Sequence, residues 1–220
     1  MLKSRLTLVG AAAAVLLATA PAAMPSPSYG YPGAEVYGPR SHPLGMSYER
    51  WLARSMTWLQ EIPAPKNPVF HPASSRNCEV RGRVVFMGPF GTGNRVCEVP
   101  QGKVIALNHS VIYECSTAEG NGRTYRKLRR CAVSQFEKNF ARARVGIRID
   151  GERLQQPRAW TFTSMGTVVD FPRNNIWGTQ AGPSKSVTRG VLFLIKPLDT
   201  GRHVITRTTS NLRWRFNVTP

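Results

Sequence analysis

Alternation of apolar and polar residues marks several segments of the chain as β-strands. The last segment, 212–218, reads Leu-Arg-Trp-Arg-Phe-Asn-Val, which places apolar side chains on one face and polar side chains on the other. The segment 144–149 alternates in the same way and ends at Asp150-Gly151, a pair typical of tight turns. The segment 191–195 is continuously apolar, which is typical of a central strand covered on both faces.

Further strands are expected where apolar and β-branched residues gather between Gly and Pro turns. The segments 80–87 and 94–99 flank the Gly-rich loop 88–93, and together they predict a β-hairpin. The remaining predicted strands are 103–113, 160–171 and 203–208.

Two segments carry their apolar residues at helical spacing instead. The first begins at Ser47, a residue type favoured at helix N-caps, and ends before Pro63. Its inner face is Tyr48, Trp51, Leu52, Ser55, Trp58, Leu59 and Ile62. Few basic residues flank this face, so we expect it to pack on the domain rather than on a membrane surface. The second helix is predicted from Leu128, Ala132, Phe136 and Phe140, which are spaced by four.

Many short strands with only two helices predict a mainly β fold. We expect an antiparallel β-sandwich, with a jelly roll as one variant, that carries an N-terminal amphipathic helix and one inserted helix.

The N-terminal part of the chain has the pattern of an export signal. A short basic start, an apolar Ala-rich stretch and small residues before a cleavage point predict a signal peptide over residues 1–22. Residues 23–45 are rich in Pro, Gly, Ser and Tyr without periodicity, which predicts a flexible linker. The structured domain is then residues 46–220, exported to the periplasm or the extracellular space.

Basic residues outnumber acidic ones by 30 to 12, and the formal net charge of the 220 residues is +18. Loss of residues 1–22 removes Lys3 and Arg5, so 28 basic and 12 acidic residues leave a net charge of +16. Such a charge favours anionic partners, which outside the cytoplasm are an anionic envelope polymer or a membrane surface. Colloidal solubility without any partner is the alternative.

The densest positive charge follows the third predicted strand. The candidate anion-binding residues are Arg123, Arg126, Lys127, Arg129 and Arg130, together with the outward-facing Arg148, Arg213 and Arg215. A solvated charged face is the competing interpretation. Tyr125 is the only aromatic residue within the first cluster, and the chain shows no nucleic-acid-binding motif.

Four cysteines, Cys78, Cys97, Cys115 and Cys131, predict a disulfide framework in an exported chain. Three pairings are possible. We favour Cys115 with Cys131, because this bridge ties the end of a strand to the start of the second helix, which leaves Cys78 and Cys97 around the first hairpin. The cysteines are 16 to 19 residues apart without flanking histidines, so we expect no metal site.

His109 lies within the predicted strand 103–113, on the same face as Ile105, Leu107 and Val111. A hydrogen-bonded core histidine is one interpretation, and a polar group in a small-ligand pocket is the other. The chain lacks the P-loop, the G-x-S-x-G and H-E-x-x-H motifs and any C-x-x-C pair, so no catalytic residue and no cofactor are predicted.

Several short motifs follow one another in a definite order along residues 48–218. They are Trp51-x6-Trp58 ahead of Asn67-Pro68, the strand 82–87, Arg95-Val-Cys97-Glu-Val-Pro100-x-Gly102-Lys103, Ile149-Asp150-Gly151 and Gly201-x-His203-x-Ile205. This order resembles a group of exported bacterial proteins of unknown function, whose members share a Trp-rich helix, an N-P turn, a G-P-V-W-F-L-like strand and an R-x-C-x-V-P-x-G-K segment. The chain departs from the group at Arg83, Phe86 and Ala106-Leu107. The resemblance implies no activity and no site residue.

Three functions are compatible with these observations. The first is a non-enzymatic binding protein that uses its Arg-rich surface to hold an anionic partner. The second is a small-molecule or glycan-binding sandwich, with or without enzymatic activity, that has a pocket near His109. The third is a purely structural secreted protein. The oligomeric state is open.

Overall fold

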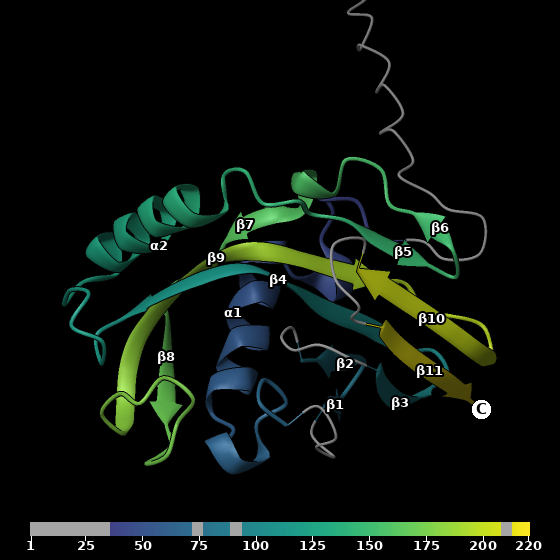
Figure 1. The fold of residues 1–220 in the computed structure, drawn as a ribbon, viewed down its shortest axis with the longest axis horizontal. Coiled ribbons are helices and arrows are strands. Elements are labelled where there is room, and N and C mark those ends of the chain that lie inside the picture. Colours follow the sequence, from purple (N-terminus) through teal and green to yellow (C-terminus); the bar gives the residue numbers. More distant parts are fainter. Residues whose placement is uncertain (1–35, 72–76, 89–93, 208–212) are drawn as a thin grey trace, which may run out of the picture.

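A computed structural model describes residues 36–71, 77–88, 94–207 and 213–220, and Figure 1 shows their arrangement. The described chain is mainly β, with two sheets and two α-helices, as the sequence predicts. The predicted signal peptide 1–22, the predicted linker up to residue 35 and residues 89–93 lie outside the described residues, so these predictions are not tested there.

The larger sheet, sheet A, has the order β1-β2-β4-β9-β7, and β8 also pairs with β9. Its strands are β1 (Cys78–Arg81), β2 (Val84–Met87), β4 (Val104–Ser116), β7 (Thr161–Thr163), β8 (Thr167–Phe171) and β9 (Gly182–Ile195). The smaller sheet, sheet B, has the order β3-β11-β10-β5-β6. Its strands are β3 (Asn94–Pro100), β5 (Ile147–Ile149), β6 (Glu152–Arg153), β10 (Gly201–Arg207) and β11 (Arg213–Thr219).

The helix α1 (Tyr48–Gln60) lies under sheet A, and α2 (Tyr125–Phe140) lies over its other face (Figure 1). The one-turn helices are η1 (Pro43–Gly45), η2 (Ala64–Lys66) and η3 (Pro157–Trp160). Buried side chains of both sheets and of α1 form the main core, as a fold of packed layers requires. A smaller cluster on the other face of sheet A joins Cys115 and Val187 to Leu128 and Ala132 of α2.

The hairpin predicted between 80–87 and 94–99 is wrong. The chain turns earlier, at Gly82-Arg83, so β1 and β2 themselves form an antiparallel hairpin. Gly82 has a φ of 60°, a conformation that glycine adopts without steric cost and that two-residue hairpin turns require. The strand β3 then joins sheet B, where it runs parallel to β11. The pair β2 and β4 is also parallel, so the sheets are antiparallel only in their other pairs.

The strand β9 is much longer than the apolar segment 191–195. Its first half carries Ser184, Ser186 and Thr188, which are buried polar residues, so its sequence lacks the apolar run of the second half. The region 160–171 is likewise divided into β7 and β8, because the chain turns away between them and Met165 N–H donates to Glu49 O of α1 (3.3 Å).

The linker predicted over 23–45 is too long at its C-terminal end. Val36 is buried and forms an isolated β-bridge with Ile195, and Tyr37 N–H donates to Leu194 O at 2.9 Å. The side chains of Tyr48 and Trp160 both donate to Tyr37 O, at 2.7 and 2.9 Å. Residues 36–45 therefore belong to the packed domain.

The helix α1 begins after Ser47, as the sequence predicts, and α2 contains the predicted residues Leu128, Ala132, Phe136 and Phe140. The chain after α1 is fixed by the N-P turn, because Asn67 Nδ2 donates to Leu59 O (2.7 Å) and Ile62 O (3.0 Å). Trp58 stacks on Phe86 of β2 with ring centroids 5.6 Å apart, which anchors α1 on sheet A.

Two disulfides tie these layers together. Cys115 of β4 is bonded to Cys131 of α2, with a Cα–Cα distance of 6.1 Å, as favoured from the sequence. Cys78 is bonded to Cys97, with a Cα–Cα distance of 5.8 Å. Because β1 and β3 belong to different sheets, this second bridge joins sheet A to sheet B rather than closing a hairpin.

Candidate functional site

A groove opens where α2 ends. The segment 141–145 forms one wall, residues 156–159 around η3 form another, and the ends of β5, β6 and β10 complete it. Its volume is about 1300 Å³. Six arginines line it: Arg142, Arg144, Arg148, Arg153, Arg158 and Arg207. No carboxylate lines the groove, and within the described residues no ion pair joins any of the six arginines to Asp or Glu.

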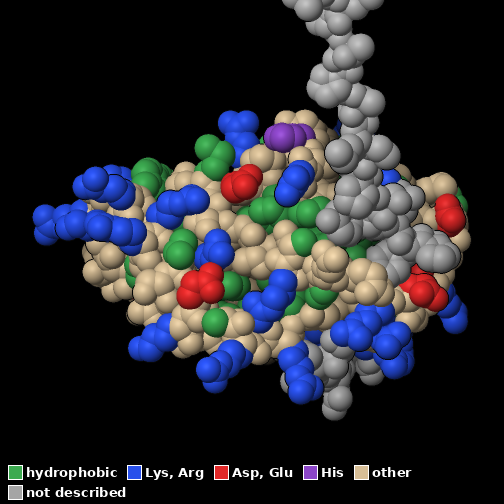
Figure 2. All heavy atoms as spheres, turned by 90° about the horizontal axis from the view of Figure 1, so that it is seen from above, with side chains coloured by type: hydrophobic (Ala, Val, Ile, Leu, Met, Phe, Trp, Pro, Cys, Tyr) green, Lys and Arg blue, Asp and Glu red, His purple; other side chains and the backbone are tan. Residues whose placement is uncertain are grey.

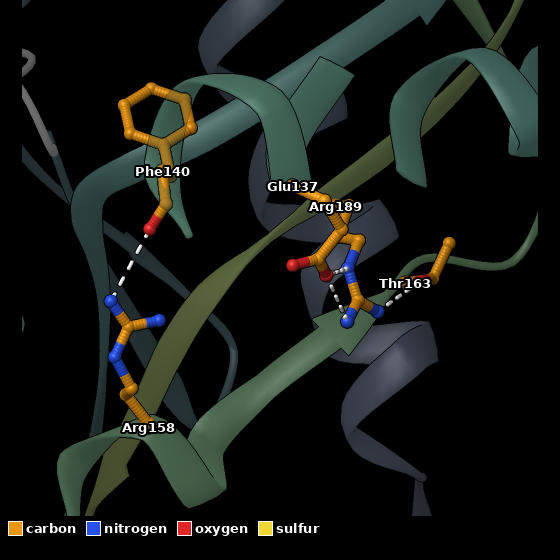
Figure 3. A network of polar contacts seen from close by, with 5 residues as sticks. All are labelled: Glu137, Phe140, Arg158, Thr163 and Arg189. Carbon is orange, nitrogen blue, oxygen red and sulfur yellow. Dashed lines mark hydrogen bonds and ion pairs between the residues drawn. The ribbon is translucent and has the colours of Figure 1, made fainter. Parts of the chain in front are cut away.

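Three of these arginines are held in place by neutral acceptors. Arg158 Nη2 donates to Phe140 O at 3.3 Å (Figure 3) and also to Ala143 O. Arg148 Nη1 donates to Gly151 O at 2.8 Å, and Arg207 Nη1 donates to Ser110 Oγ. These bonds restrict the side chains and leave their positive charge uncompensated.

Arg207 is the innermost of the six. It stands on the same face of β10 as Ile205, which points into the core, and its side chain is half-buried. Burial lowers the pKa of Arg207, because a low-dielectric environment disfavours the charged form. A half-buried cation without an anion is costly, so the inner end of the groove is the place where a bound oxyanion would be most stabilising.

Arg189 shows the opposite arrangement in the same part of the fold. Its guanidinium is 3.0 Å from Glu137 Oε1 and donates to Thr163 Oγ1 at 2.9 Å (Figure 3). It also lies over the Phe136 ring, 5.2 Å from the ring centroid. The charge of Arg189 is thus compensated within the domain, and Arg189 does not line the groove.

His109 is a packed core residue with 3% exposure and is not part of the groove wall. A register shift between Asn108 and Ile112 makes the chain irregular here, and Val111 N–H donates to His109 Nδ1 at 3.1 Å. Burial, and then the charge of Arg207, lower the pKa of His109 to about 3, so its ring is neutral at ordinary pH. Its Nε2 is buried without a hydrogen-bond partner within the described residues.

The predicted cluster Arg123, Arg126, Lys127, Arg129 and Arg130 lies at the start of α2, and all five side chains are exposed. Figure 2 shows Lys and Arg side chains gathered at this end of the molecule. The rise of an α-helix puts Arg129 about 20 Å from Arg142, so the α2 cluster and the groove are separate sites. Of the eight predicted anion-binding residues, only Arg148 lines the groove.

Arg213 and Arg215 are exposed on β11, as their alternation predicts, and they lie on the same outer face of sheet B as Arg148. The candidates of the sequence analysis do not include the other five groove arginines, Arg142, Arg144, Arg153, Arg158 and Arg207. Arg207 carries a signal that could have identified it, because it occupies an inward position of a strand, where a charged residue is unusual.

Two other ionisable residues, Glu114 and His203, lie outside the groove and have hydrogen-bond partners within the domain. Burial raises the pKa of Glu114 to about 8, against a hydrogen bond of 2.5 Å from Ser186 Oγ that favours the charged form. His203 Nδ1 is 2.7 Å from Asp150 Oδ2, and its Nε2 is 2.8 Å from Asp199 O. Both ring nitrogens of His203 are therefore occupied, which removes it as a general base.

Comparison of the chain with protein-family models, curated proteins and solved structures finds no match.

The arginines of the groove present guanidinium groups, which are suited to oxyanions. Guanidinium groups match phosphate, sulfate and carboxylate with two parallel hydrogen bonds, and none of the lining residues is a Ser, Cys, His or carboxylate. Within the described residues, no three His, Cys, Asp or Glu side chains are grouped to hold a metal ion. In the same part of the chain no helix is long and apolar enough to span a membrane.

Proposed function

We propose that this is an exported, non-enzymatic protein that binds an anionic partner in the arginine-lined groove. The observation that carries the proposal is the gathering of six arginines around one concavity that no carboxylate of the described residues lines. Such a concavity concentrates positive potential, attracts anions over a Debye length of about 8–10 Å at physiological ionic strength, and offers bidentate contacts on arrival.

Export is supported by the pattern of residues 1–22 and by two disulfides, which persist in oxidising compartments. N-terminal sequencing of the protein isolated from its host tests this part. Cleavage after Ala22, with Ala23 as the first residue, is the expected result, and a retained Met1 would refute export by this signal.

The resemblance to exported bacterial proteins of unknown function is proposed as a family relation. Its support is that distant motif pieces have joint structural roles. Asn67 of the N-P turn fixes the end of the Trp-containing helix, and Asp150 binds both the ring of His203 and Val204 N–H (2.7 Å).

The anion-binding proposal is tested with two triple variants that change the net charge equally. Arg142→Glu/Arg144→Glu/Arg153→Glu reverses the groove, and Arg126→Glu/Arg129→Glu/Arg130→Glu reverses the start of α2. All six residues are exposed and make no side-chain hydrogen bond in the described structure, so the fold should survive both changes. Calorimetric titration with long-chain polyphosphate at low salt measures the affinity.

We expect the groove variant to bind at least about 30-fold more weakly, since three lost charge contacts of about 0.7 kcal/mol each sum to about 2 kcal/mol. The α2 variant should lose no more than about fivefold, through the weaker long-range field. Equal losses would mean a diffuse field without a site, and a larger loss in the α2 variant would move the site there. Absence of binding by the unmodified protein would refute the proposal and favour a structural role.

A further inference from the structure

We infer that the groove is the inner part of a longer basic track, which crosses the strands of sheet B and takes an extended linear polyanion without aromatic bases. This inference rests on the proposed function and adds the shape and class of the ligand. The track is defined by Arg215, Arg213, Thr206, Arg148 and Arg153, and it continues into the groove.

The strand register places these residues in one row. Thr206 of β10 is paired with Arg213 of β11 on one side and with Arg148 of β5 on the other. Arg148 is in turn paired with Arg153 of β6. Neighbouring strands are about 4.8 Å apart, so the row extends about 14 Å across four strands.

The row and the groove are continuous. Arg148, Arg153 and Thr206 belong to both, while Arg213 lies beyond the groove on the open face of the sheet. Arg215 follows two residues later on the same face of β11, because side chains two apart along a strand point the same way. The three arginines Arg148, Arg153 and Arg213 are all exposed, so a ligand can reach them without rearrangement.

Asp150, Glu98 and Glu152 are carboxylates of sheet B and its turns that lie beside this row. Asp150 accepts hydrogen bonds from Val204 N–H and from His203 (2.7 Å each). Glu98 on β3 accepts a hydrogen bond from Asn217 Nδ2 at 3.1 Å. Glu152 precedes Arg153 on β6 and is paired with Ile149, one position along the strand from the row. The negative charge of these carboxylates therefore lies beside the row, whose own members are three arginines and the neutral Thr206.

The side chains of the track determine the ligand class. A single small anion can occupy only one or two guanidinium groups, whereas an extended chain with regularly repeated oxyanions can contact the whole row. Among the described residues no aromatic side chain lines the groove or stands in the row, so these residues offer no surface for stacking bases. The geometry therefore points to a linear polymer of phosphates, carboxylates or sulfates, in which the charge repeat is the recognised feature.

The experiment compares short and long ligands on an outer-track variant. Tripolyphosphate and long-chain polyphosphate are titrated into the unmodified protein, into Arg213→Glu/Arg215→Glu, and into a control of equal charge, Arg123→Glu/Arg130→Glu. We expect the outer-track variant to bind long polyphosphate at least about tenfold more weakly and tripolyphosphate within about twofold of the unmodified protein. The α2 control should change both affinities by the same small factor.

An unchanged affinity of the outer-track variant for long polyphosphate would overturn the track while leaving the groove intact. If only the groove variant Arg142→Glu/Arg144→Glu/Arg153→Glu loses binding, the track is likewise overturned and the groove is retained. The two proposals can therefore fail independently of each other. Thermal unfolding of each variant shows whether it is folded, and Arg213→Gln/Arg215→Gln, which removes charge without adding carboxylates, repeats the test in a milder form.

Titrations with other polymers identify which oxyanion the track prefers. Oligogalacturonate presents carboxylates and dextran sulfate presents sulfates at comparable chain length, and a preference among the three polymers assigns the oxyanion. Single-stranded poly-dT of equal charge should bind no more tightly than polyphosphate. Tighter binding of poly-dT would overturn the inference, because it would require base contacts that the track does not offer.

Discussion

The two ends of α2 carry the two densest groups of arginines, and the helix acts on them in opposite ways. At its start, Arg126, Lys127, Arg129 and Arg130 face the positive end of the helix dipole, and the first turn contains no acidic residue. At its end, Arg158 donates to the carbonyls of Phe140 and Ala143, where the dipole is negative. Positive charge is thus unfavourable at the start of α2 and favourable at its end.

This comparison distinguishes arginines that only contribute to the electrostatic field of the protein from arginines that form a binding site. The end of α2 has arginines restrained by backbone carbonyls around a concavity, and so their positions are set before a ligand arrives. The start of α2 has arginines on an exposed convex surface, which contribute to solubility and to long-range attraction. A count of Arg and Lys along the sequence does not distinguish the two regions. Only at the groove do the arginines surround a concave surface.

The largest effect that we expect concerns Glu114, which lies next to Cys115, the β4 residue disulfide-bonded to α2. Burial raises the pKa of Glu114 to about 8 and keeps its carboxyl protonated at neutral pH, so Glu114 adds no negative charge to the strand that is bonded to α2. A raised pKa means that the folded state binds the proton more tightly than the unfolded state does. The associated stability is complete below the ordinary pKa of 4.5 and is lost as the pH rises through 8.

Glu114→Gln should therefore be less destabilising, or even stabilising, at alkaline pH. The free energy of unfolding of the unmodified protein, relative to the variant, should fall between pH 5 and pH 8 by at most about 1.4 kcal/mol per pH unit. Urea unfolding at a series of pH values measures this difference. A difference that is independent of pH would show that the carboxyl is solvated and ionised, and that β4 carries a negative charge next to its disulfide with α2.

The second effect removes the restraint at the end of α2. Arg158→Ala deletes charged hydrogen bonds to two carbonyls, and we expect the free energy of unfolding to decrease by about 1–2 kcal/mol, since the site is exposed. Arg142→Ala, in the same groove but without a hydrogen bond in the described structure, should change it by less than about 0.5 kcal/mol. Thermal unfolding followed by circular dichroism compares the two. Similar values for both variants would mean that the carbonyl contacts do not hold the groove in shape.

The smallest effect has the opposite sign. Arg126→Glu/Arg129→Glu places negative charge near the positive end of the helix dipole and should stabilise the protein by about 1 kcal/mol at low ionic strength. The gain should shrink as salt is added, because both charges are exposed and screened. Destabilisation by this pair, measured by the same thermal unfolding, would show that these arginines have structural partners and would erase the contrast between the two helix ends.

The sequence predicted most elements of the fold, and its failures have physical causes. The strand β11 and both helices were visible because one face of each is buried and the other is solvated. The first half of β9 was missed because it buries Ser184, Ser186 and Thr188, so that burial there does not follow hydrophobicity. The false hairpin arose because Gly88 and Gly91 made a stronger turn signal than Gly82, where the chain in fact turns.

The groove could not be assembled from the sequence in the same way. Its arginines come from the α2–β5 connection, β5, β6, η3 and β10, which only the two-sheet topology brings together. Alternation identified Arg148, Arg213 and Arg215 as outward-facing, and this was correct. The strand register that aligns Arg148 with Arg153 and Thr206 depends on tertiary pairing and leaves no local pattern.

The bridge between Cys78 and Cys97 has a consequence for how this chain behaves before it is oxidised. The strands β1 and β3 are the outermost strands of their sheets, and Val80 and Val96 are exposed on them to 43% and 67%. Unpaired strand edges beside exposed valines are templates for intermolecular pairing. The disulfide fastens the two free edges to each other, so it acts as protection against self-association, and a chain kept reduced in a cytoplasm would present both edges at once.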